Sequence, residues 1–312
     1  METVAVIGAG LMGHGIAQVF ALQGFAVRLA DIRQDILDSA VGNVRANLKL
    51  LAGRNFVRKE DVEPAVARIE TSTEMDQAVS GADIVIEAVI EDLALKRKIF
   101  SDLDAGLPEE TILASNTSVI SITEIAADTV SKNRVVGTHF WNPPYLIPLV
   151  EVIRGEDTTD DVMERTMDLL TRVGKHPVRV NKDVPGFVGN RLQHALWREA
   201  ISIVEQGIAD AATVDECVKF GFGLRLPVLG PMENVDLVGT DLTLAIHDYI
   251  LSHIERSPAP SQMLRNLVAR GDLGFKSGRG FQSWSPEDIE DTHNRLKTHL
   301  LQVISQSGKK GE

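Results

Sequence analysis

A glycine-rich stretch near the start of the chain constrains the fold more than any other feature. Residues 4–31 read VAVIGAGLMGHGIAQVFALQGFAVRLAD, in which Gly8, Gly10 and Gly13 form a GxGxxG motif. A short apolar strand precedes the motif, a helical pattern follows it, and the next apolar run ends at Asp31. A strand, a glycine turn, a helix and an acidic residue in this order are typical of a dinucleotide site.

Each glycine of the motif has a physical role. Gly8 permits the tight turn, Gly10 lets a pyrophosphate approach the backbone, and Gly13 lets the helix pack closely on the strand. The free N–H groups and the positive dipole end of the helix then face the phosphates. The predicted cofactor site also includes Leu11 and Met12, which lie between the glycines. The alternative is a glycine-rich turn that binds no ligand.

The acidic residue that ends the second strand indicates which dinucleotide is bound. The carboxylate of Asp31 can accept hydrogen bonds from both ribose hydroxyls and would repel a 2′-phosphate. The sequence therefore predicts NAD rather than NADP as the cofactor. Arg33, two residues further on, is the one nearby feature that favours NADP.

Apolar runs and helical patterns alternate through the first half of the chain. Further strands are predicted within residues 82–92, 111–121 and 134–140, around Glu151, and over 176–180; helical patterns cover about 32–51, 60–67 and 93–103. This alternation predicts an α/β fold of Rossmann type, with a doubly wound, mainly parallel sheet.

The alternation stops after residue 183, where apolar residues fall at helical spacing. The sequence thus predicts a nucleotide-binding domain over residues 1–183 and an all-α domain over residues 184–312. The apolar faces of these helices exceed what one small domain can bury, so a homodimer through this second domain is expected.

Composition excludes some partners. The 312 residues carry a net charge of −12, which argues against a nucleic-acid backbone or an anionic membrane as the main partner. Cys217 is the single cysteine, which fits a reducing compartment, and no apolar run reaches the length of a membrane span. We expect a cytoplasmic protein that acts on a small molecule, without a metal in its site.

The segment HFWNPPYLIPLVEV, residues 139–152, places a histidine and a glutamate on either side of a proline-rich loop. Pro143 and Pro144 cannot donate to a strand ladder, so the first strand must end before them. A strand ending near His139, a loop, and a second strand carrying Glu151 is the simplest geometry. His139 would then lie at a strand end, where active sites of open α/β sheets are found.

Polar residues follow two other predicted strands. Asn116 and Ser118 come after the strand TILA, where small polar residues usually form turns but can also supply a hydroxyl to a substrate. Glu91 and Lys96 follow the strand before it and border the same crevice. Spacing alone favours an ordinary helix N-terminus and a solvated lysine at these two positions.

Over nearly its whole length the chain resembles the L-3-hydroxyacyl-CoA dehydrogenase family. The motifs that carry the resemblance are, in order, GAGLMGHGIA, VIEAVIEDLALK, ASNTSVI, HFWNPPYLIPLVEVI, DVPGFVGNRL and GFKSGRGF. Their order and spacing are more specific than any one of them. The resemblance implies an eight-stranded, mainly parallel sheet, a helical domain that forms dimers, and NAD-dependent oxidation of a 3-hydroxy group.

The resemblance also implies roles for individual residues. His139 resembles the catalytic base and Glu151 its carboxylate partner, while Ser118 and Asn190 resemble the residues that hold the substrate oxygen. Several further positions match cofactor contacts of the family: Asp31, Ala88, Glu91, Lys96, Asn116 and Ser118. The predicted substrate site comprises Ser118, Asn142, Asn190 and Arg225.

Three features differ from the fatty-acid members of the family. Pro148 stands where those members have a lysine, residues 221–239 form a longer segment, and an extra helix begins at Ser285. These features are similar to relatives that oxidise free hydroxy acids, such as gulonate 3-dehydrogenase, lambda-crystallin and a dehydrogenase of vitamin B6 breakdown. Arg225 suits a free carboxylate, although an ordinary ion pair is an equal alternative. Basic residues within 43–61 suit either CoA phosphates or a solvated helix face.

Two other classes of protein remain open from the sequence. A dehydrogenase of the 3-hydroxyisobutyrate or phosphogluconate type shares the nucleotide platform but relies on a lysine base from its helical domain. A non-catalytic protein that binds NAD is the second alternative. The pair of His139 and Glu151 speaks against the first alternative, and the intact set of four catalytic-looking residues speaks against the second.

Overall fold

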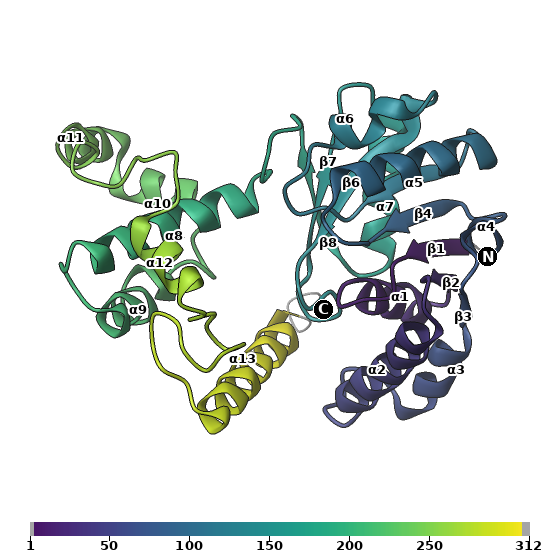
Figure 1. Ribbon diagram of the computed structural model, residues 1–312, viewed down its shortest axis with the longest axis horizontal. Helices are drawn as coiled ribbons and strands as arrows, with labels where there is room; N and C mark the ends of the chain where they lie inside the picture. The colour runs from purple at the N-terminus through teal and green to yellow at the C-terminus, as the bar shows by residue number, and fades with distance from the viewer. Residues whose placement is uncertain (1–2, 308–312) are drawn as a thin grey trace. The chain divides into compact units, whose positions relative to one another are not determined.

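The computed structural model describes residues 3–307, and these divide into two compact units. The first unit comprises residues 3–190 and 300–307; the second comprises Arg191–His299 (Figure 1).

The first unit is built on one eight-stranded sheet with the order β3-β2-β1-β4-β5-β6-β7-β8. Neighbouring strands are parallel except β6 and β7, which are antiparallel. The order confirms the predicted doubly wound sheet. The strands are β1 (Thr3–Ile7), β2 (Ala26–Ala30), β3 (Ile69–Ser72), β4 (Ile84–Glu87), β5 (Ile112–Ser115), β6 (Val135–Phe140), β7 (Leu149–Ile153) and β8 (His176–Val180).

Helices cover both faces of this sheet because the strands are apolar on both sides. One face packs on α1, α2, α3 and α7 around Ile16, Leu37 and Met163. The other face packs on α4, α5 and α6 around Phe100 and Ile122. The helices of the first unit are α1 (Gly13–Leu22), α2 (Gln34–Ala52), α3 (Val62–Ala67), α4 (Met75–Val79), α5 (Leu93–Gly106), α6 (Ile122–Ile125) and α7 (Asp160–Arg172), with 3-10 turns at Lys59–Asp61, Ala126–Asp128 and Lys132–Arg134.

The strand order reverses between β1 and β4. The chain moves outward from β1 through β2 to β3 and then returns to place β4 on the other side of β1. In open α/β sheets a ligand crevice forms at such a point, beside the carboxyl ends of the strands. The glycine motif follows β1, so the fold places it at this crevice.

Strand β3 was not predicted from the residue pattern. It comprises only Ile69–Ser72 at the sheet edge, and the two central residues, Glu70 and Thr71, are exposed. Such a segment has neither the apolar run nor the clear alternation that indicates a strand. Pairing with the inner strand β2 stabilises it, and that contact is invisible in the local sequence.

The second unit is helical, as predicted, and α8 and α13 extend into it from the first unit. Helix α13 begins as expected after Ser285, whose hydroxyl accepts a hydrogen bond from the Asp288 N–H at 3.1 Å. Among residues 3–307, no helix is both long and apolar enough to cross a membrane. The helices are α8 (Gly189–Glu205), α9 (Ala211–Phe220), α10 (Pro231–Val238), α11 (Thr240–Ile250), α12 (Gln262–Ala269) and α13 (Pro286–Ser307), with a 3-10 turn at Phe222–Leu224.

The packing of helix α1 on β1 leaves no room for a side chain at Gly13. A Cβ atom at Gly13 would lie 1.7 Å from the carbonyl oxygen of Gly8, which is backbone and cannot move aside alone. We expect Gly13→Ala to lower the free energy of unfolding by about 1–3 kcal/mol, the usual cost of overpacking, and to weaken NAD binding.

Chemical denaturation and a fluorescence titration with NADH check both effects. Gly42→Ala is the matched control, because a Cβ at Gly42 of helix α2 meets nothing within 4 Å. That change should stabilise the helix by up to about 1 kcal/mol. Equal stabilities of the two variants would contradict the packing role of Gly13.

Candidate active site

The turn after β1 has the backbone geometry that a dinucleotide crevice needs. Gly8 has φ 95°, a conformation that side chains rarely adopt, and a Cβ there would lie 2.7 Å from the carbonyl oxygen of Ala88. Ala88 directly follows β4, and its N–H donates to Ile7 at 2.7 Å. The turn therefore sits against the end of β4, at the point where the strand order reverses.

Open space and free donors lie at the next positions. A Cβ at Gly10 would meet no atom within 4 Å, so the backbone there is open to a ligand. Within the described residues, no backbone carbonyl accepts a hydrogen bond from the N–H groups of Leu11 or Met12. The first turn of α1 also carries no acidic residue. These features fit a pyrophosphate held by the helix N-terminus.

Asp31 lies at the end of β2, beside the glycine turn. One of its carboxylate oxygens accepts a hydrogen bond from the N–H of Ala9 at 2.9 Å, and the other accepts from the N–H of Arg33 at 3.2 Å. The guanidinium of Arg33 is bound to Asp35 through Nε at 3.0 Å and through Nη2. Arg33 is therefore paired with Asp35 in an exposed ion pair, which would compete with a 2′-phosphate for the guanidinium.

We expect Asp31→Ser to weaken NAD binding about 10- to 100-fold, the usual effect of losing hydrogen bonds to a charged group. NADP should remain a poor cofactor because Asp35 still holds Arg33. Adding Asp35→Asn should release Arg33 and raise the ratio of kcat/KM for NADP over NAD, measured by steady-state kinetics. An unchanged ratio in the double variant would contradict this account of cofactor choice.

His139 and Glu151 face each other across two antiparallel strands. They are directly paired in the register of β6 and β7, and His139 Nδ1 lies 2.8 Å from Glu151 Oε2. Both residues are buried. Because the carboxylate can only accept, Nδ1 carries the proton in the neutral ring, and Nε2 is left with a lone pair. The strand, loop and strand expected from the prolines are present.

The second oxygen of Glu151 is held by the backbone at the start of α8. Glu151 Oε1 accepts hydrogen bonds from the N–H groups of Val188 at 2.9 Å and Gly189 at 3.0 Å. Two residues of the preceding turn adopt left-handed backbone conformations, Gly186 with φ 78° and Phe187 with φ 49°, and this turn directs the two N–H groups toward the carboxylate. Phe187 is wholly buried and is not a glycine, so this backbone conformation is strained and held by packing.

These contacts keep the carboxylate charged. Burial would raise the pKa of Glu151, but the hydrogen bonds from His139, Gly189 and Val188 outweigh it and leave the pKa below its ordinary value. A charged Glu151 fixes the tautomer of the imidazole and stabilises the imidazolium that forms when Nε2 takes a proton. The pair can therefore act as a general base near neutral pH.

Two aromatic rings enclose the imidazole. The ring of Trp141 lies 5.2 Å from that of His139, and the ring of Phe187 lies 5.9 Å away. A Cβ at Gly189 would lie 2.4 Å from the Trp141 indole, so the indole occupies the space beside α8. The sequence reasoning missed both aromatic residues, and only their closeness to His139 and Asn190 along the chain could have indicated them.

The structure brings some of the other predicted residues to this site. Asn190 is buried, and its side-chain amide donates to the Ser118 carbonyl at 2.9 Å. The side chain of Asn116 accepts from the Phe140 N–H at 2.8 Å, which ties the end of β5 to the residue after His139. Within the described residues, no hydrogen bond is recorded for the Ser118 hydroxyl. The ends of β5 and β6 and the start of α8 thus converge here.

Two predicted substrate residues are exposed to solvent. Asn142 is exposed in the loop after β6, and Arg225 is exposed in the second unit, at the end of a 3-10 turn. Their part in substrate binding stays a prediction.

Glu91 and Lys96 belong to a network that centres on Glu87, a residue that the sequence reasoning missed. Lys96 Nζ lies 2.7 Å from Glu87 and 3.5 Å from Glu91. The Lys96 side chain is wholly buried, whereas that of Glu91 is 39% exposed. A direct contact of Lys96 with a cofactor therefore stays a prediction, whereas Glu91 borders the turn that carries Ser118.

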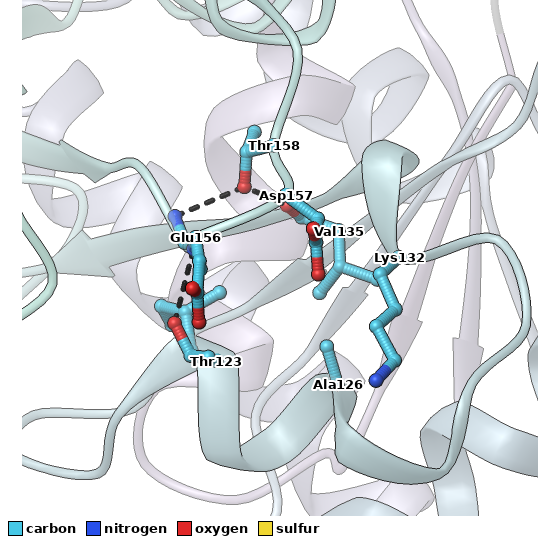
Figure 2. A pocket seen from close by; sticks show the side chains of 9 residues that line it. Thr123, Ala126, Lys132, Val135, Glu156, Asp157 and Thr158 are labelled. Carbon is cyan, nitrogen blue, oxygen red and sulfur yellow. Dashed lines mark hydrogen bonds between the residues drawn. The ribbon is translucent and has the colours of Figure 1, made fainter.

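A separate hollow of the first unit lies at the opposite end of β6. Val135, the first residue of β6, lines it together with Thr123, Lys132 and Glu156, and its cavity volume is about 70 Å³ (Figure 2). The hydroxyl of Thr123 accepts a hydrogen bond from the Glu156 N–H at 3.0 Å across it. His139 lies near the other end of the strand, so this hollow is not the candidate active site.

A glycine crevice for a dinucleotide, beside a buried histidine and carboxylate, defines a nicotinamide-dependent oxidoreductase. Residues 3–184 match the family model for the 3-hydroxyacyl-CoA dehydrogenase NAD binding domain, and residues 186–284 match that for its C-terminal domain. The chain belongs to the 3-hydroxyacyl-CoA dehydrogenase family, and NAD is its cofactor.

Two kinds of relative are similar to this chain. Mitochondrial hydroxyacyl-coenzyme A dehydrogenase of Rattus norvegicus is 40% identical over 91% of this chain and 91% of its own length. The 5-formyl-3-hydroxy-2-methylpyridine 4-carboxylate 5-dehydrogenase of Mesorhizobium japonicum is 34% identical over 97% of each chain. A solved structure of a dehydrogenase of this second kind, described as an NAD-dependent dismutase, has a TM-score of 0.90, 32% identity and 97% coverage of both chains.

Proposed function

We propose that this chain oxidises a 3-hydroxy group, of an L-3-hydroxyacyl-CoA or a related hydroxy acid, to the ketone with NAD. The observation that carries the proposal is the buried pair of His139 and Glu151, joined at 2.8 Å on the sheet that forms the dinucleotide crevice. An alcohol loses its hydride only if its hydroxyl proton leaves as well. A neutral imidazole backed by a carboxylate removes that proton at neutral pH.

The residues around the pair divide the remaining tasks. Bound NAD supplies the acceptor for the hydride. His139 Nε2 takes the hydroxyl proton, and Glu151 stabilises the resulting imidazolium. We propose that Ser118 and Asn190 orient the substrate oxygen, and that Asn142 and Arg225 contact the rest of the substrate. The cofactor would be held by the glycine turn and by the other predicted contacts: Leu11, Met12, Asp31, Ala88, Glu91, Lys96 and Asn116.

A second candidate substrate is a free carboxylate-bearing alcohol or aldehyde. The match to the pyridine-carboxylate relative covers 97% of this chain, whereas the match to the hydroxyacyl-coenzyme A dehydrogenase covers 91%. Two basic residues of the region that suited CoA phosphates are also paired, Arg45 with Glu63 at 3.1 Å and Arg58 with Asp61 at 2.7 Å. Both observations favour a substrate without CoA.

Initial rates of NAD reduction test these proposals. The purified chain is supplied in parallel with L-3-hydroxybutyryl-CoA, with free hydroxy acids such as gulonate, and with a pyridine-carboxylate alcohol or aldehyde. A kcat/KM at least about 100-fold higher for one class assigns the substrate, since this corresponds to nearly 3 kcal/mol of differential transition-state binding. No turnover of any of them, with NAD bound, favours the non-catalytic alternative.

We also propose a homodimer formed through residues 184–312. The described part of the second unit carries many large apolar side chains that are exposed within one chain, which is unusual for a monomer. They include Phe220, Val228, Met232, Leu237, Leu244 and Tyr249. Light scattering of the purified chain should give twice the mass of 34.0 kDa. A monomer at micromolar concentration contradicts the proposal.

We also propose that the chain is located in the cytoplasm. The support is the single cysteine, Cys217, which is free and exposed, as befits a reducing compartment. Fractionation of cells that express the chain tests this location.

A further inference from the structure

A glutamate that the proposed function does not use lies at the centre of the first unit. Glu87 ends β4 and is wholly buried. One carboxylate oxygen accepts hydrogen bonds from Lys96 Nζ and from the Val89 N–H, each at 2.7 Å. The other oxygen accepts from the hydroxyl of Ser115, the last residue of β5, at 2.6 Å. Three donors thus fix this carboxylate in one position.

Lys96 connects Glu87 to a second carboxylate. It extends from α5 and is wholly buried, and its ammonium lies 2.7 Å from Glu87 Oε1 and 3.5 Å from Glu91 Oε2. A buried ammonium needs a charged partner, because an isolated charge in the interior is strongly disfavoured. Glu87 is the closer of the two partners, so it determines where the ammonium lies.

Glu91 in turn holds the turn that carries Ser118. Its carboxylate accepts hydrogen bonds from the Thr117 hydroxyl at 2.9 Å and from the Ser118 N–H. The carbonyl of Ser118 then accepts from the Asn190 side chain at 2.9 Å. The network therefore reaches, step by step, both residues proposed to hold the substrate oxygen.

We propose that Glu87 is a positioning residue that sets the Thr117–Ser118 turn through Lys96 and Glu91. Glu87 is not among the residues proposed to contact substrate or cofactor, and its own side chain is wholly buried. Its effect is to keep the ammonium of Lys96 away from a full ion pair with Glu91. The carboxylate of Glu91 then stays bound to the Ser118 N–H. Only the kinetic part of this inference rests on the proposed function.

Glu87→Gln is the variant that tests the network. The neutral amide can still accept from Ser115 or Val89, but it leaves the ammonium of Lys96 with Glu91 as its one carboxylate partner. We expect the ammonium to close on Glu91 and draw it away from the turn. Hydrogen exchange of the Ser118 amide should then be at least about tenfold faster, as expected when a local hydrogen bond is lost. This readout needs no substrate.

A matched control separates this effect from a general loss of stability. Helix α5 carries a second buried ion pair, in which Arg134 Nη2 lies 2.8 Å from Asp104 with both side chains at most 5% exposed. Asp104→Asn should lower the melting temperature but leave both the Ser118 exchange rate and kcat unchanged. An equal rise in Ser118 exchange in this control overturns the proposal.

The double variant Glu87→Gln/Lys96→Met covers the case in which the single variant does not fold, because it buries no unpaired charge. In this variant no ammonium competes for Glu91, which still accepts from the Thr117 hydroxyl and the Ser118 N–H, so the Ser118 amide should keep its wild-type protection. Rapid exchange of that amide in the folded double variant would show that Glu91 leaves the turn without the ammonium, and this overturns the proposal.

The kinetic test is a double-mutant cycle between Glu87 and Glu91. Glu87→Gln should lower kcat about tenfold in the wild-type background but less than about twofold when Glu91→Gln is already present, because residues that act in series are not additive. If the wild type turns over rapidly and Glu87→Gln lowers kcat equally in both backgrounds, Glu87 does not act through Glu91, and the proposal is overturned. A wild type without turnover would contradict the proposed function instead, and the exchange measurement would still decide the role of Glu87.

Discussion

Replacing His139 by glutamine is expected to lower kcat about 10²- to 10⁴-fold, the usual contribution of a general base. Glutamine fits the buried space and can still donate a hydrogen bond to Glu151, so the strand pairing of β6 and β7 should survive. It has no nitrogen lone pair that can accept a proton at neutral pH. The loss should therefore fall on the chemical step.

Binding and stability separate this effect from misfolding. The glycine turn and Asp31 do not contact His139, so the dissociation constant for NADH should stay within about twofold, a change of less than 0.5 kcal/mol. His176→Gln is the matched control, because His176 is an exposed residue at the start of β8 in the same sheet. Full activity of the His139 variant would instead indicate a lysine base from the helical domain, as in dehydrogenases of the 3-hydroxyisobutyrate type.

Local signals explain why the nucleotide platform was predictable. Residues 4–31 contain the local signal for each part of the site: a glycine at the position with φ 95°, a glycine where the helix approaches the strand, and an acidic residue at the end of the next strand. The pairing of His139 with Glu151 was predictable for a similar reason. Prolines between two apolar runs require the first strand to end before them. Two strands that are consecutive in the chain and joined by a short loop usually lie side by side in the sheet, which brings His139 and Glu151 together.

The buried network of Glu87, Lys96 and Glu91 could not be predicted from local sequence in this way. The spacing of Glu91 and Lys96 suited an ordinary helix start, and nothing local shows that Lys96 points inward to Glu87. A lysine is buried only when tertiary structure supplies its partner, here a carboxylate on β4. The family resemblance implied a cofactor contact for Glu91 and Lys96 but gave no role to Glu87.

The turn that holds Glu151 is a second example of what the sequence concealed. Phe187 adopts φ 49°, which a bulky residue avoids unless its surroundings impose it. Its side chain is buried in the same core cluster as Ile122 and Phe100, and this burial offsets the local strain. No residue pattern predicts a left-handed phenylalanine, yet this conformation directs two N–H groups to the carboxylate.

A loss of the same order is expected for Glu151→Gln, which is nearly isosteric but reverses one hydrogen bond. The amide oxygen can still accept from the N–H groups of Val188 and Gly189. The amide nitrogen then faces His139 Nδ1 and can only donate to it, so the ring proton moves to Nε2. The ring presents a donor where a base is required, and kcat should fall about 10³- to 10⁴-fold, as for the equivalent change in serine protease triads.

The same substitution should change how stability depends on pH. The pKa of Glu151 is lowered in the folded chain, so its contribution to stability is present above the ordinary pKa of a glutamate. That contribution is lost as the pH falls through the lowered folded value. Between pH 6 and about pH 3, the wild type should therefore lose more stability than the variant. Denaturation curves across this range measure the difference, and parallel curves would contradict a charged Glu151.

The double variant His139→Gln/Glu151→Gln shows whether the two residues act as one unit. If Glu151 works only through the imidazole, removing it costs nothing further once His139 is gone. The kcat of the double variant should then lie within about threefold of that of His139→Gln alone, whereas independent effects would multiply to 10⁵-fold or more. A multiplicative loss would assign Glu151 a task of its own, such as holding Val188 and Gly189 at the start of α8, and the pair could no longer be treated as a single base.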